Sequence, residues 1–78
     1  MPPGTSEVRH YHQKAAQFFY VLKGTLFIDI DGRGFSLSPG QGVEVDPGQI
    51  HQVDNRGAVD AEFLVFSSPP SHGDRIEV

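Results

Sequence analysis

Residues 25–37 read TLFIDIDGRGFSL, and this stretch decides the fold class. Two runs of branched and aromatic residues flank Asp31-Gly32, a pair that type I′ turns favour because both central residues need positive φ. The stretch therefore predicts a tight β-hairpin. Around it, from Gly24 to Gly57, glycine or proline recurs every few residues, so no helix of ordinary length fits there.

The segments between these breakers are short and apolar, and they predict further strands. They are residues 25–30, 34–37, 42–45, 50–54 and 61–67.

The stretch before Gly24 is ambiguous, because residues 13–17 have helix propensity. Alternation in 7–12 and the aromatic run 18–22 favour two strands joined near Lys14, the second buried on both faces. Short strands at regular spacing predict an all-β sandwich or barrel, to which residues 75–78 could add an edge strand.

The composition limits the class of protein. The chain has 78 residues, which suits one domain over 1–78 with an extended tail at about 68–78. It lacks cysteine, so disulfides and thiolate metal sites are excluded. Its net charge of -4 argues against nucleic acid, and its apolar runs are too short to cross a bilayer. We expect a soluble, cytoplasmic protein with no nucleic-acid or membrane partner, stabilised by metal or oligomerisation.

Three histidines lie in strand contexts. His10 and His12 are two residues apart, so a strand places them on one face, at a spacing that suits chelation of one ion. Gln17 begins the next predicted strand, and His51 follows a turn. If the chain folds back on itself, the side chains of these three histidines and of Gln17 converge. The alternative is a chance His-x-His pair whose rings are satisfied by backbone groups. His72, in the tail, is expected at the surface.

Two stretches resemble the two motifs of the cupin superfamily. The first is Gly4-x5-His10-x-His12-x4-Gln17-x6-Gly24, and the second is Gly40-x5-Asp46-Pro47-Gly48-x2-His51-x3-Asn55. Gln17 stands where the family normally carries glutamate, and Asp46 takes the place of the usual proline. The resemblance implies a small double-stranded β-helix, the cupin or jelly-roll barrel. It also implies that His10, His12, Gln17 and His51 are the ligands of a divalent transition metal. The motif glycines are expected in turns, and Asn55 is expected to tie a corner through its amide.

Glutamine changes the chemistry that such a site can perform. A neutral amide leaves the ion its full dipositive charge, which makes it a stronger Lewis acid but lowers the affinity of the site. Neutral nitrogen and oxygen ligands suit Zn, Mn, Fe, Ni or Cu and do not choose among them. In the alternative, three histidines hold the metal and Gln17 only hydrogen-bonds nearby.

The resemblance implies a metal-binding small cupin that acts on a small organic molecule. Dioxygenase chemistry is expected with Fe, Mn, Ni or Cu, and isomerase or cyclase chemistry with Zn. The alternatives are a non-catalytic ligand-binding or sensor module and a metal-free structural barrel. No catalytic residue can be assigned. Alternation predicts apolar pocket walls from Phe19 and Val21, beside Gln17, and from Val8 and Val53.

Cupin barrels usually have strands before the first motif, whereas here that motif begins at Gly4. The chain is therefore expected to be a fragment, or a minimal, N-terminally shortened barrel whose sheet edge is covered by a second copy. More aromatic and apolar surface is present than one small barrel buries, which predicts a homodimer. The residues concerned are Phe18, Tyr20, Leu22, Phe63 and Phe66.

Overall fold

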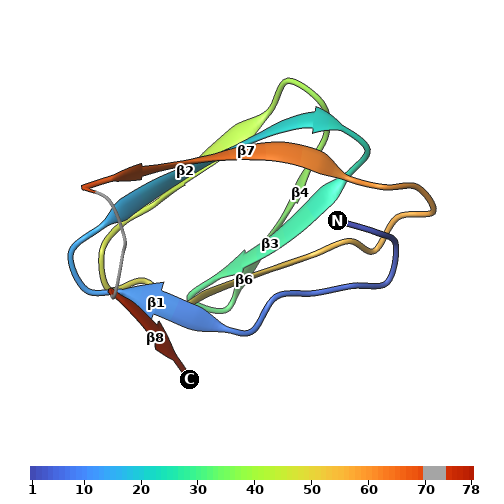
Figure 1. The fold of residues 1–78 in the computed structure, drawn as a ribbon. Coiled ribbons are helices and arrows are strands. Elements are labelled where there is room, and N and C mark those ends of the chain that lie inside the picture. The colour runs from blue at the N-terminus through green and yellow to red at the C-terminus, as the bar shows by residue number, and fades with distance from the viewer. Residues whose placement is uncertain (70–73) are drawn as a thin grey trace.

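The computed structural model describes residues 1–69 and 74–78. These residues form eight strands and no helix (Figure 1). The strands are β1 (His10–His12), β2 (Ala16–Lys23), β3 (Leu26–Ile30), β4 (Arg33–Leu37), β5 (Gly42–Val45), β6 (His51–Asp54), β7 (Glu62–Ser68) and β8 (Arg75–Glu77). The prediction of an all-β fold is confirmed. Among the described residues, nothing forms a helix with the length and apolarity needed to cross a bilayer.

The strands form two antiparallel sheets that face each other. One sheet has the order β4-β3-β6-β1-β8, and the other has the order β5-β2-β7. In Figure 1, β2 and β7 form one layer, and β3 and β6 run through the other. The two strands predicted on either side of Lys14 are present, but β1 and β2 belong to different sheets and do not pair with each other. Residues 13–15 cross from one sheet to the other instead, because each strand finds its partners elsewhere in the chain.

The β3–β4 hairpin is formed as predicted. Ile30 pairs with Arg33 across a two-residue turn, in which Asp31 has φ 50° and Gly32 has φ 83°. Both angles are positive, as a type I′ turn requires. The Asp31 carboxylate accepts a hydrogen bond from the backbone N–H of Ile50 at 2.9 Å. The turn is thereby tied to the residue that precedes β6.

The first strand is shorter than predicted. Residues 7–12 alternate in sequence, but the regular strand begins only at His10. Before it, Ser6 makes a single bridge to Asp54, and Val8 is 51% exposed. At the other end of the chain, β8 pairs with β1 and confirms the predicted edge strand. The expected surface residue His72 lies outside the described residues.

The glycines of the two motifs serve turns, as expected. Gly4, Gly24, Gly40 and Gly48 all have φ between 74° and 86°. Asn55 also ties a corner as expected, because its amide donates to the carbonyl oxygens of Met1 at 2.9 Å and Val59 at 2.8 Å. These residues therefore shape the backbone around the interior.

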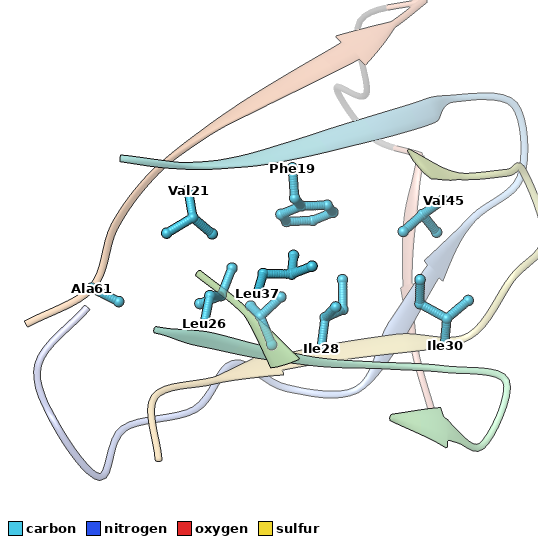
Figure 2. Close-up of a cluster of buried hydrophobic side chains, with 9 residues drawn as sticks. Phe19, Val21, Leu26, Ile28, Ile30, Leu37, Val45 and Ala61 are labelled. Atoms are coloured by element: carbon cyan, nitrogen blue, oxygen red, sulfur yellow. The ribbon is translucent and has the colours of Figure 1, made fainter. Parts of the chain in front are cut away.

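The core lies between the two sheets (Figure 2). Phe19 and Val21 point from β2 toward Leu26 and Ile28 of β3, and all four are buried. Because alternate residues of a strand share a face, the next inward position along β2 is Gln17. The apolar core therefore continues without a break into a cluster of buried polar side chains.

The outer face of β2 is not covered within the described residues. Phe18 is 42% exposed and Leu22 46% exposed, whereas the inward Phe19 is 3% exposed. The prediction that this strand is buried on both faces is therefore wrong for the chain alone. Only one face of the three-stranded sheet meets another layer, since the fold has two layers rather than three.

Candidate metal centre

The three histidines singled out from the sequence meet between the sheets. His10 and His12 project from β1, and His51 projects from the first position of β6, directly beside His10 in the ladder. All three are buried. Each offers one ring nitrogen, and these three atoms all lie within 4.8 Å of one another. The three histidines therefore converge as predicted, and the pairing of β1 with β6 within one sheet brings them together.

Two of the histidines are oriented by the backbone. Nδ1 of His10 lies 2.7 Å from the carbonyl oxygen of Val8, and Nδ1 of His51 lies 3.1 Å from that of Gln49. Each Nδ1–H therefore donates to the carbonyl two residues earlier. The Nε2 atom of each ring is left with its lone pair free, which is the form in which imidazole binds a metal.

The third histidine shows that the cluster fits a cation. His12 is 5% exposed, and neither of its ring nitrogens has a hydrogen-bond partner among the described residues. An unsatisfied buried polar group costs about 1–3 kcal/mol. A metal ion shared with His10 and His51 would bind one of these nitrogens. The donor set of neutral imidazoles is one that Zn, Cu, Fe or Ni accepts.

Gln17 reaches the cluster from the opposite sheet. Its Nε2 donates to Oγ of Ser67 at 3.0 Å, and its Oε1 lies 3.2 Å from Nε2 of His51. Since the His51 proton lies on Nδ1, both of these atoms present lone pairs. Two ligand atoms at about 2.1 Å from one ion, at an angle of about 100°, lie about 3.2 Å apart. The spacing fits two adjacent ligands of a common metal.

The protonation of the histidines favours metal binding. Burial lowers the pKa of His12, and the adjacent His10 lowers it further. Burial also lowers the pKa of His51, against the opposing effect of its bond to the Gln49 carbonyl. Both of these rings are therefore neutral at neutral pH, which is the form in which imidazole binds a cation.

A pocket of about 200 Å³ opens beside the cluster. In addition to His10, His12 and Gln17, its walls are Glu7, Phe19, Val65 and Arg75.

The predicted apolar walls are only partly correct. Phe19 lines the pocket, but Val21 and Val53 are 0% and 1% exposed and belong to the core. The expectation for Val8 is wrong, because the alternation that would turn it inward does not extend beyond His10. Glu7 and Arg75 also line the pocket, so part of its wall is charged rather than apolar.

Sequence reasoning did not find several residues around the site. Ser67 meets Gln17 because β7 pairs with β2 in that register, and Arg75 meets His12 because β8 pairs with β1. The alternation within each strand predicts which residues share a face, but not which residue of another strand lies opposite. Glu7 and Val65 were missed for the same reason.

Known proteins resemble this chain in sequence and in structure. The chain is 32% identical over 69 residues to the tetracenomycin polyketide synthase protein TcmJ of Streptomyces glaucescens, covering 88% of this chain and 46% of that protein. A crystal structure of a protein from Thermus thermophilus matches with 28% identity and a TM-score of 0.84, covering 88% of this chain and 66% of the other. A predicted oxalate decarboxylase from Thermotoga maritima matches with 30% identity and a TM-score of 0.81, covering 86% of this chain and 58% of the other.

The chain spans about half the length of the polyketide synthase protein that it resembles. The family assignment is independent of that difference in length, since residues 1–67 match the cupin domain. The two-layered all-β fold and the buried histidine cluster agree with this match. The chain belongs to the cupin family.

Proposed function

We propose that this cupin holds a divalent transition metal and acts on a small organic molecule bound in the adjacent pocket. The observation that carries the proposal is the buried histidine cluster, in which His12 has no other partner among the described residues. The proposed ligands are His10, His12, His51 and the amide oxygen of Gln17. The identity of the metal, Zn, Mn, Fe, Ni or Cu, stays open because these neutral ligands suit all five.

A metal bound there would supply a Lewis acid that polarises an oxygen of the organic ligand. The chain's own residues would do the rest. Phe19 and Val65 line the pocket with apolar surface, which orients a flat ligand and excludes water. Glu7 is the acidic residue of the pocket wall, and its side-chain oxygens can accept hydrogen bonds from the ligand.

Two reaction classes fit this arrangement. Isomerase or cyclase chemistry is supported by the neutral ligand set, which leaves a Zn ion strongly electrophilic, and by likeness to a polyketide synthase protein. Dioxygenase chemistry requires Fe, Mn, Ni or Cu in the same position. Identification of the native metal therefore separates these two classes.

A non-catalytic small-ligand sensor is the second candidate. It is favoured by Gln17, because an amide cannot transfer the proton that a glutamate ligand could. Oxygen uptake and product formation with a panel of phenols and cyclic ketones distinguish the two candidates. Binding without turnover supports the sensor, and turnover supports the enzyme.

Metal content after mild purification tests the proposal directly. We expect close to one transition metal ion per chain by elemental mass spectrometry. The variant His51→Ala should lose it, and His72→Ala, which removes a histidine that is not among the proposed ligands, should retain it. Wild-type protein that binds none of the five ions, even when they are added, contradicts the metal centre.

We also propose that two copies associate through the outer face of the three-stranded sheet. Phe18 and Phe66 lie side by side on this face, with ring centroids 6.5 Å apart. Leu22 and Leu64 extend the patch and are 46% and 43% exposed. A second copy would bury this surface, while Phe63 contributes to the core instead.

A further inference from the structure

Arg75 faces the same interior as the histidines. It pairs directly with His12 across the β1–β8 ladder, and directly opposed residues of an antiparallel pair project from the same face. Arg75 also lines the pocket together with Gln17 and Phe19. Arg75 therefore borders the space that a ligand would enter, and its guanidinium is the group that could reach such a ligand.

This guanidinium is not paired with an acid among the described residues. The arginine ion pairs found there, within 4.0 Å, join Arg9 to Asp29 and Arg56 to Asp54. The preceding residue, Asp74, accepts the backbone N–H groups of residues 13–15 instead. Arg75 can therefore donate to a ligand without breaking an ion pair within this part of the chain.

With a divalent ion bound, the charges around the pocket would add up to a positive interior. All the proposed metal ligands are neutral, so a bound ion keeps two positive charges, and Arg75 adds another. Glu7 is the acidic residue of the wall and offsets one of them. Glu77, opposite His10, is exposed and does not line the pocket. Because the whole chain has a net charge of -4, this positive region is local.

We propose that Arg75 binds the carboxylate of the ligand, so that the pocket selects small organic acids with an apolar body; this inference rests on the function proposed above. A planar guanidinium can donate two parallel hydrogen bonds to one carboxylate. Phe19 and Val65 provide the apolar surface for the body of the acid. A pocket of about 200 Å³ suits an acid with a single ring, since a cavity of about 150 Å³ is enough to bind benzene.

Benzoate and benzamide provide the test, because they share a shape and differ in charge. Their dissociation constants are measured by calorimetry on metal-loaded protein. In the wild type, benzoate should bind at least tenfold more tightly than benzamide. In Arg75→Gln the benzoate-to-benzamide ratio should fall at least fivefold, while benzamide binding changes less than twofold. Arg75→Lys keeps the positive charge but lacks the planar guanidinium with its two parallel donors, so it should give an intermediate ratio.

Arg33→Gln is the matched control. Arg33 is also exposed and lies on β4, at the opposite edge of the same sheet, so its replacement should leave the ratio unchanged. Metal content and thermal unfolding are measured on the same samples. A ratio that Arg75→Gln does not alter, in folded protein that carries metal, overturns this inference alone. Wild-type protein without metal overturns the proposed function instead.

Discussion

Gln17 is the proposed ligand that comes from the three-stranded sheet, whereas the three histidines come from the five-stranded one. Its side chain has two fixed contacts, with Nε2 on Ser67 and Oε1 facing His51. In this orientation the amide oxygen faces the histidines, whereas a carboxamide flipped by 180° would direct an N–H toward them. Ser67 anchors the far end of the amide of this proposed ligand.

The substitution Gln17→Glu tests whether this side chain binds the metal. A carboxylate of similar size would add a negative charge next to the ion, and Ser67 can donate to it. We expect metal affinity to rise at least tenfold, equivalent to about 1.4 kcal/mol, measured by competition with a chromogenic chelator.

The exposed Gln13 supplies the control for that substitution. Gln13→Glu adds the same charge outside the pocket and should change the affinity less than threefold. Unchanged or weaker binding in Gln17→Glu would show that Gln17 is not a ligand and that three histidines hold the metal without it.

The element that completes the pocket is β8, a strand of three residues at the edge of a sheet. A strand this short has few ladder hydrogen bonds. Asp74, immediately before it, accepts three further ones from the backbone N–H groups of Gln13, Lys14 and Ala15, at 3.0–3.1 Å. The carboxylate therefore attaches β8 to the crossing between the two sheets and holds Arg75 at the pocket.

Asp74→Asn should weaken this attachment in a pH-dependent manner. The hydrogen bond from Lys14, with those from Ala15 and Gln13, lowers the pKa of Asp74 below its ordinary value of 3.8. A lowered folded-state pKa stabilises the fold above the ordinary value, and this stabilisation is lost as the pH falls through the lowered pKa. At pH 7 we expect the variant to melt a few degrees below the wild type. The difference should shrink below about pH 3.8.

Melting curves between pH 2 and 8 check this prediction. Asp60→Asn serves as the control, because the side chain of Asp60 is exposed in a loop. A difference in melting temperature between the wild type and Asp74→Asn that stays constant over the whole pH range would contradict the role assigned to this carboxylate.

At the scale of the whole molecule, apolar side chains gather both in the buried interior and on one solvent-exposed sheet face. The space between the sheets holds the core and the histidine cluster. The outside of the three-stranded sheet presents Phe18, Leu22, Leu64 and Phe66, each more than 40% exposed. Contiguous apolar surface of this kind marks association sites in small proteins.

Light scattering at micromolar concentration should give a mass of twice the 8.6 kDa of one chain. Phe66→Asp places a charge in the proposed interface and should shift the mass to that of the monomer. Val59→Asp changes a residue that is 62% exposed in a loop, and it should leave the dimer intact. A monomeric wild-type protein under these conditions would exclude the proposed dimer.

Much of the fold could be predicted from the sequence because its signals are local. The Asp31-Gly32 turn needs two residues with positive φ, and its type follows from those residues alone. The glycine and proline spacing excludes long helices, and the period of two places His10 beside His12. These rules act over a few neighbouring residues, so they hold before the chain is folded.

The tertiary structure decided which strands pair and which side chains lie opposite one another. It placed β1 and β2 in different sheets, left the outer face of β2 bare, and set Ser67 against Gln17 and Arg75 against His12. Register between distant strands depends on the packing of the whole interior, and a shift of one residue would turn each side chain to the other face. The pair His10 and His12 could therefore be found by its spacing, and the resemblance to the cupin motifs added Gln17 and His51. The residues that orient these side chains and line the pocket depend on long-range pairing.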